Sequence, residues 1–185
     1  MSKIASPGAT AVTEPRGLDR RSFLAGTAVG AIIISGSALI CTREAWGLEV
    51  KAIKPETARA LIKMARDIYP HDRLADKFYA VAVKGYDDKA GKDEAMRKRL
   101  EDGVTALDTA AMAAHGVPYA DVGWEEQRVA LLRPIEGGAF FQGIRSDLVV
   151  SLYNQPEVWP LFGYEGESAS EGGYINRGFN DIKWL

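Results

Sequence analysis

The chain between residues 55 and 153 carries apolar residues at the three- and four-residue spacing of amphipathic helices. A first helix is predicted to begin at Pro55, where proline is tolerated in the first turn, and to end before Pro70. Asp72 is placed to cap a second helix. The apolar stripes of these two helices are Ala58, Leu61, Ile62, Ala65, Ile68 and Tyr69, then Leu74, Phe78, Val81, Ala82 and Gly85 with Tyr86 beside them.

Three further helices follow. A long one is predicted from the charged stretch 87–99, which forms a solvated face, to His115. Shorter ones are predicted from about Trp124 to Leu132 and from Ala139 to Tyr153. No alternating strand segment of useful length appears, so the pattern predicts an all-α fold, a compact helical domain of about five helices. The buried side of the long helix is expected to be Met96, Leu100, Val104, Leu107, Ala111 and Met112.

From Asn154 onward the pattern changes, with five glycines and six aromatic residues among the last 32 residues. This stretch is too apolar for a disordered linker and too broken for a helix, which predicts an extended tail lying on a surface. That surface belongs either to its own domain or to another protein, and both interpretations stay open. Aromatic residues are frequent anchors of protein interfaces. The candidate interface residues are Phe140, Phe141, Tyr153, Trp159, Phe162, Tyr164, Tyr174 and Trp184.

Residues 1–47 differ from the rest of the chain. Arg20-Arg21 precedes Ser22-Phe23-Leu24, and the 21 residues from 22 to 42 carry no charge. The run is long enough to span a bilayer, but its many Gly, Ser and Thr residues make it weakly apolar for a permanent anchor. With Arg20, Arg21, Phe23 and Leu24 as its export motif, the segment resembles a twin-arginine signal. A retained N-terminal anchor is the alternative.

The small residues of Ala45-Trp46-Gly47 predict cleavage near Gly47, so that a single domain, 48–185, remains. Cys41, the one cysteine of the chain, would leave with the signal. The remainder would carry 18 basic and 22 acidic residues. Thiol catalysis and disulfides are thereby excluded for the mature chain.

Composition excludes several classes of function. The net charge of −2 over 185 residues lacks the basic excess that a nucleic-acid-binding protein needs. One cysteine and two histidines are too few for a structural zinc site, a cysteine-bound iron–sulfur cluster or a haem attachment motif.

Local motifs offer little chemistry. Gly166-Glu167-Ser168-Ala169-Ser170 lacks the final glycine of a nucleophile elbow and is interpreted as a polar loop. His71-Asp72 is interpreted as a helix stop followed by a cap rather than a catalytic pair. No phosphate-binding or dinucleotide loop is present in the sequence. We therefore assign no catalytic, cofactor-binding or metal-binding residue.

Taken together, these features resemble the gluconate 2-dehydrogenase subunit 3 family, the small (gamma) subunits of bacterial FAD-dependent sugar and alcohol dehydrogenase complexes. The motifs that carry the resemblance are Arg20-Arg21-Ser22-Phe23-Leu24, then Ala65 to Asp72, Phe140-Phe141 with Ile144-Arg145, Leu152 to Pro156, Gly163 to Gly166, and Gly172-Gly173-Tyr174.

The resemblance implies a chain that is not catalytic by itself. In such complexes a large subunit of the glucose-methanol-choline oxidoreductases holds FAD, oxidises CH–OH groups of sugars, polyols or glycosides, and often lacks an export signal. The small subunit escorts the folded partner past the twin-arginine translocase receptor into the periplasm and stabilises it. Some of these complexes include a cytochrome c subunit, and any haem or iron–sulfur cluster belongs to subunits other than the small one. The complex is periplasmic, with at most a peripheral association with the membrane.

Two alternatives from other classes remain open. The chain could be an independent periplasmic enzyme, with a pocket around His71, Asp72 and tail residues. It could instead be a membrane-anchored binding protein that keeps residues 22–42.

Overall fold

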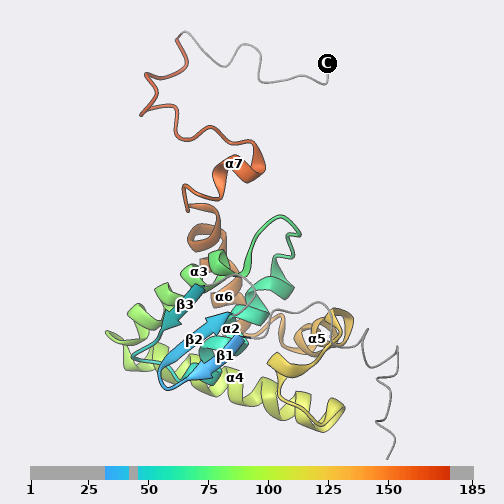
Figure 1. Ribbon diagram of the computed structural model, residues 1–185. Coiled ribbons are helices and arrows are strands. Elements are labelled where there is room, and N and C mark those ends of the chain that lie inside the picture. Colours follow the sequence, from blue (N-terminus) through green and yellow to red (C-terminus); the bar gives the residue numbers. More distant parts are fainter. Residues whose placement is uncertain (1–31, 42–45, 176–185) are drawn as a thin grey trace, which may run out of the picture.

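The computed structural model describes residues 32–41 and 46–175, and the chain is predominantly helical, which confirms the all-α prediction (Figure 1). The helices are α2 (Pro55–Ile68), α3 (Asp76–Ala90), α4 (Glu94–His115), α5 (Glu125–Leu132), α6 (Ala139–Tyr153) and the single turn α7 (Trp159–Phe162), with short 3-10 turns η1 (Tyr119–Asp121) and η2 (Arg133–Ile135).

Helix α2 lies at the centre of the helical body and contacts α3, α4, α5 and α6. Ala58, Leu61 and Ala65 of its predicted apolar stripe are fully buried, and so is Met64, which the prediction did not include. Because every other long helix packs against α2 or its neighbour α3, the core is one continuous cluster.

Several predicted helix ends are confirmed. Helix α2 begins at Pro55 and α6 has the predicted bounds. Helix α4 ends at Gly116, whose φ of 72° lies in the left-handed region where glycine is favoured. At its other end the Asp93 carboxylate accepts hydrogen bonds from the amides of Ala95 and Met96.

Two predicted helix starts are wrong. Asp72 does not cap α3, which begins at Asp76 after Ala75 and has no side-chain cap. The charged stretch beginning at Asp87 does not open the long helix, because Asp87 lies in the last turn of α3 and α4 begins only at Glu94. Asp87 is also buried rather than solvated. Its carboxylate binds the backbone that precedes α2, a long-range contact that the local pattern does not reveal.

Two residues assigned to apolar stripes are exposed, Val81 on α3 and Met112 on α4. The inner side of α3 instead includes Tyr79 and Val83. Periodicity fixes the width of an apolar face, but the buried centre of that face depends on how neighbouring helices cross it.

Three short strands that the sequence pattern did not predict lie almost wholly in the region assigned to the signal. β1 (Ile32–Ser35), β2 (Ala38–Cys41) and β3 (Trp46–Glu49) form an antiparallel sheet in the order β1-β2-β3. A two-residue turn at Gly36-Ser37 joins the first two strands, with Gly36 at a φ of 61°. Strands of four residues are too short for their alternation to be recognised beside helical stripes.

The sheet packs on the helical body, where β1 and β2 contact α2 and β3 contacts α3. Leu39 on β2 is fully buried, and the Val50 amide donates to the Ser37 carbonyl over 2.9 Å. The predicted cleavage position at Gly47 therefore falls inside β3. The predicted export residues Arg20, Arg21, Phe23 and Leu24 lie outside the described residues. Within the ranges that the structure describes, no helix combines the length and apolarity needed to cross a membrane.

Candidate functional site

Four rings meet where the chain leaves α6, and we call Tyr69, His71, Tyr153 and Phe162 the tail-base cluster. The His71 Nε2 atom is hydrogen-bonded to the Tyr153 hydroxyl at 2.6 Å. The ring centroids lie 5.1 Å apart for His71 and Phe162, and 5.8 Å apart for Tyr69 and Tyr153, all in edge-to-face orientation. Such aromatic pairs stabilise a defined geometry beyond the area that they bury.

Three helices hold the tail-base cluster in place. Tyr69 is the C-terminal residue after α2, and its carbonyl accepts a 2.6 Å hydrogen bond from the Tyr79 hydroxyl of α3. The Tyr69 hydroxyl donates to the Arg145 carbonyl of α6. Burial raises the pKa of Tyr79 to about 12, and burial, with the nearby Tyr69 adding to it, raises the pKa of Tyr153. Both phenols therefore stay protonated hydrogen-bond donors at neutral pH.

Beyond the cluster the chain forms what we call the aromatic segment, residues 159–175, which extends away from the helical body (Figure 1). It is anchored at its start, where Val158 is fully buried and the Trp159 Nε1 donates to the Tyr153 carbonyl over 2.8 Å. The large apolar side chains that follow are exposed to 49% at Phe162, 50% at Tyr164 and 62% at Tyr174.

The structure brings together only some of the eight predicted interface residues. Tyr153, Trp159, Phe162 and Tyr164 lie at the base of the aromatic segment, and Trp159 stacks edge-on against Tyr164. Tyr174 lies further along the segment, and Trp184 is outside the described residues. Phe140 and Phe141 lie at the opposite end of α6 and are partly buried.

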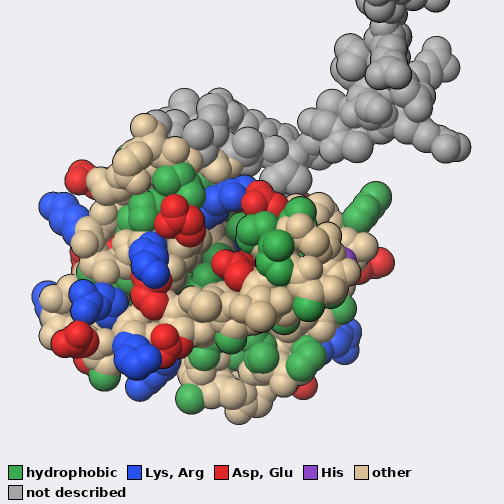
Figure 2. All heavy atoms as spheres, turned by 90° about the horizontal axis from the view of Figure 1, so that it is seen from below, with side chains coloured by type: hydrophobic (Ala, Val, Ile, Leu, Met, Phe, Trp, Pro, Cys, Tyr) green, Lys and Arg blue, Asp and Glu red, His purple; other side chains and the backbone are tan. Residues whose placement is uncertain are grey.

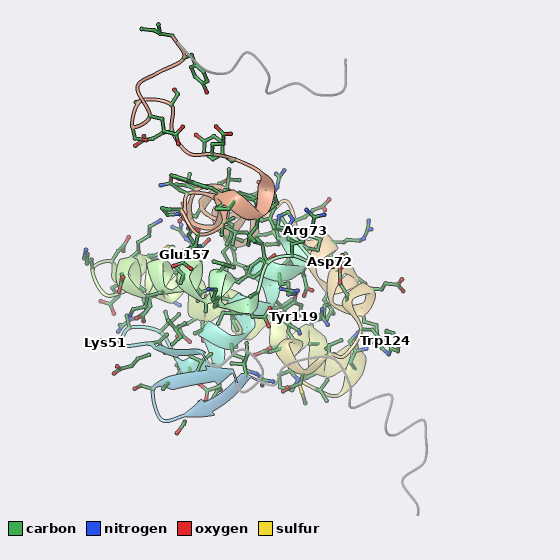
Figure 3. The ribbon with its side chains drawn as sticks, turned by 45° about the horizontal axis from the view of Figure 1, so that its top comes forward. Lys51, Asp72, Arg73, Tyr119, Trp124 and Glu157 are labelled. Carbon is green, nitrogen blue, oxygen red and sulfur yellow. The ribbon has the colours of Figure 1, made fainter. Side chains whose placement is uncertain are left out.

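Sequence reasoning missed a buried charged network inside the helical body. Arg128 of α5 binds Asp67 of α2 through two hydrogen bonds of 2.7 Å, one to each carboxylate oxygen. The Tyr119 hydroxyl donates to the same carboxylate over 2.6 Å, and Figure 3 shows Tyr119 within the body. The remaining Arg128 donor binds the carbonyls of Val122 and Gly123. Tyr119 and Arg128 lie 52 and 61 positions after Asp67, so no local motif predicts that they meet it.

This network is a structural ion pair rather than a reactive group. Burial, reinforced by the charge of Asp67, raises the pKa of Tyr119. Burial and the adjacent Arg128 guanidinium lower the pKa of Lys63. Both Asp67 oxygens accept hydrogen bonds and the side chain is almost fully buried, so the carboxylate serves to hold Arg128 and Tyr119 in place.

A second buried carboxylate, Asp87, fastens the segment that leads into α2. It accepts hydrogen bonds from the amides of Lys51, Ala52 and Ile53 and from the Lys84 ammonium. Burial alone would raise its pKa, but these hydrogen bonds hold the pKa of Asp87 below its usual range. Asp87 thus positions backbone amides in the way that a helix cap does, but for a segment that is far away in the sequence.

The other residues considered as catalytic candidates in the sequence lie on the surface, away from these buried carboxylates. Asp72 and Arg73 are exposed on the side where the tail leaves the body (Figure 3). Ser170 donates to the Glu167 carbonyl in a surface turn, in line with a polar loop. Among the described residues no group of three or more His, Cys, Asp or Glu side chains is arranged to hold a metal ion.

An exposed tryptophan was also missed as a candidate. Trp124 precedes α5, is 75% exposed and stands at the outer edge of the body (Figure 3). On the face that Figure 2 shows, Lys and Arg side chains are interspersed with Asp and Glu ones rather than gathered into a patch of one sign.

No protein-family model, no curated protein and no solved structure matches this chain. The resemblance to gluconate 2-dehydrogenase subunit 3 therefore rests on its motifs alone.

Proposed function

We propose that this chain is a partner-binding subunit that is not catalytic by itself, the small subunit of an FAD-dependent dehydrogenase acting on sugars, polyols or glycosides. The observation that carries the proposal is the aromatic segment, which presents Phe162, Tyr164 and Tyr174 to solvent. Exposed aromatic side chains gathered on one segment are typical of surfaces that another protein covers.

The anchoring of this segment favours tight binding. Val158 and Trp159 attach it to α6, and Phe162 packs on His71. A segment that is ordered at its base loses less conformational entropy when a partner binds it. The tail-base cluster is thus a platform that positions the aromatic side chains.

The N-terminal motif supports a role in export. Arg20-Arg21 with Phe23-Leu24 resembles a twin-arginine signal, which carries proteins that are already folded. A flavoprotein receives FAD in the cytoplasm during folding, so a partner without its own signal needs an escort to the periplasm. FAD is assigned to the large subunit, and haem or iron–sulfur groups to a cytochrome c or other subunit.

The binding role is tested first by asking whether an adjacent reading frame encodes a large FAD-binding protein without an export signal, and then by co-expressing that protein with this chain. The triple variant Phe162→Ser, Tyr164→Ser, Tyr174→Ser is expected to weaken the complex at least tenfold in a quantitative pull-down. The control variant Val81→Ser, Met112→Ser removes exposed apolar side chains from α3 and α4 and should leave affinity unchanged. Equal affinity of the triple variant and the unaltered chain would contradict the proposal.

The export role has its own test. Replacing both arginines, Arg20→Lys with Arg21→Lys, removes the rigid guanidinium forks that distinguish Arg from Lys. Periplasmic dehydrogenase activity of the co-expressed partner is then expected to fall to background, with its cytoplasmic activity retained. Unchanged periplasmic activity would rule out the escort role.

The β1–β2 hairpin bears on where the chain is processed. Cleavage after Gly47 would remove Leu39 and uncover the part of α2 that the hairpin contacts. The intact mass of the protein recovered from the periplasm decides between a start near Leu48 and a chain that keeps residues 32–47. A retained hairpin would favour the alternative in which the N-terminal segment stays attached.

A further inference from the structure

A cleft of about 660 Å³ lies between the end of α2, α5 with η2, and the first turns of α6. Apolar side chains from all three helices line it. They are Ile68, Val129, Leu132 and Phe141. The cleft is far larger than a single water molecule needs, so it can hold several side chains of a ligand.

Two arginines flank this apolar surface. Arg133 of η2 and Arg145 of α6 both line the cleft, and within the described residues neither forms an ion pair. Asp67 also lines it, but Arg128 and Tyr119 occupy both of its oxygens. Glu136 is the one carboxylate left to oppose two guanidiniums, so the cleft favours a negatively charged ligand.

The N-terminal end of α6 strengthens this preference. Gly137 and Gln142, on either side of the helix start, line the cleft. The first turn of α6 has neither a side-chain cap nor an acidic residue. Its positive dipole end is therefore not neutralised by the helix itself and adds to the attraction of the two arginines for an anion.

One residue of the tail-base cluster, Tyr69, adjoins residues that line the cleft. Ile68 on its wall precedes Tyr69, and the Tyr69 hydroxyl binds the carbonyl of Arg145, which lines the cleft. One bound protein could thus cover the cleft, the tail-base cluster and the aromatic segment together.

We propose that this cleft binds an extended peptide segment that carries carboxylate side chains between apolar ones. The Arg133 and Arg145 guanidiniums bind the carboxylates, which they match with paired donors, and the apolar surface takes the intervening side chains. The proposal rests on the proposed function in one respect, namely that the segment belongs to the partner subunit.

The first experiment measures the complex with the co-expressed FAD-binding protein. The variant Arg133→Glu, Arg145→Glu is expected to weaken it at least tenfold, and the effect should shrink as salt rises. The control Arg99→Glu reverses an exposed charge on α4 and should change affinity less than twofold. If the variant and the unaltered chain bind the partner with equal affinity, the proposal that the cleft binds a peptide is wrong, while the proposed function is unaffected.

The second experiment does not depend on the partner. The full chain, labelled with nitrogen-15, is titrated with a pentapeptide of leucine, glutamate, phenylalanine, glutamate and leucine, blocked at both ends. Amide shifts are expected around Arg133, Gln142 and Arg145, and the peptide with glutamines in place of glutamates should bind at least tenfold more weakly. If both peptides bind equally well, or if the amide shifts occur elsewhere in the chain, the proposal that the cleft binds acidic peptides is wrong. If no complex forms with any version of the chain, the proposed function fails and this titration alone decides the inference.

Discussion

The helical body and the aromatic segment place their tyrosines in different environments. In the body, Tyr79, Tyr86 and Tyr119 are buried, and their hydroxyls donate to oxygens of Tyr69 at the end of α2, Ile144 of α6 and Asp67 of α2. In the aromatic segment, Tyr164 and Tyr174 are at least half exposed. The body thus uses its aromatic residues to join helices, while the segment presents them to solvent.

The polar groups show the same contrast. Of the buried side-chain nitrogen and oxygen atoms in the described residues, only Ser151 Oγ has no partner. When nearly all buried polar atoms are hydrogen-bonded, removing one partner leaves the other unsatisfied and lowers stability. Changes to paired groups in the body should therefore lower the free energy of unfolding, whereas a change at Tyr174, in the exposed part of the aromatic segment, should affect binding and leave stability nearly constant.

The largest effect is expected from Arg128→Met. It leaves the Asp67 carboxylate buried without its counter-charge and should lower the free energy of unfolding by about 3–5 kcal/mol. Urea denaturation followed by circular dichroism measures it. The double variant Asp67→Leu, Arg128→Met removes both charges and should recover part of the loss. A loss under about 1 kcal/mol would show that the body does not depend on this network.

The variant Asp87→Asn tests a second buried polar group of the body, and its effect on stability should depend on pH. The Asp87 carboxylate accepts hydrogen bonds from three backbone amides and from Lys84. Replacing it with a neutral amide should lower the free energy of unfolding by about 2 kcal/mol at neutral pH. Since the folded pKa is held below the ordinary 3.8, the carboxylate stabilises the fold above that value. Its contribution is lost as pH falls through the folded pKa.

The measurement is urea denaturation from pH 7 down to pH 2.5. The difference between Asp87→Asn and the unaltered chain should narrow at the acid end. Asp88→Asn, at an exposed neighbour that also pairs with Lys84, should change stability by less than about 0.5 kcal/mol at every pH. A difference that does not vary with pH would contradict the assigned role.

A smaller effect is expected where α4 approaches α6. A Cβ atom at Gly103 would lie 2.5 Å from Cγ of Phe140, so Gly103→Ala should lower the free energy of unfolding by about 1–2 kcal/mol. Gly85 of α3 has open space around it, and Gly85→Ala should raise stability by about 0.5–1 kcal/mol. Thermal denaturation compares the two, and stabilisation by both variants would disprove close packing at Phe140.

The smallest effect on stability is expected in the aromatic segment. Tyr174→Ser should change the free energy of unfolding by less than about 0.5 kcal/mol, because the side chain is 62% exposed. The same variant should weaken the complex with the FAD-binding protein. If it destabilises the isolated chain by more than about 1 kcal/mol, the segment packs on its own body and the contrast with the interior disappears.

Much of the fold could be predicted because helices leave a local record. Proline at the start of α2, glycine after α4 and the stripe of α6 act within one or two turns, and the predicted bounds there agree with the structure. The candidate site was predictable only in part. The change in composition after α6 marks the aromatic segment, but nothing local shows that His71 joins Tyr153 there, because 82 positions separate them.

The sequence by itself determined the helical class, most helix ends and the aromatic character of the last stretch, since spacing, caps and composition depend on near neighbours. Tertiary structure decided the rest. It buried Asp87 and paired Asp67 with Arg128, and it placed the strands 32–35, 38–41 and 46–49 in a sheet that packs on α2 and α3. It also separated Phe140 and Phe141 from the tail-base cluster. Each of these outcomes depends on which surfaces meet after folding. The residues next to a charged or β-branched side chain in the sequence are the same whether that side chain ends up against a partner or in water, so they cannot predict which it will be.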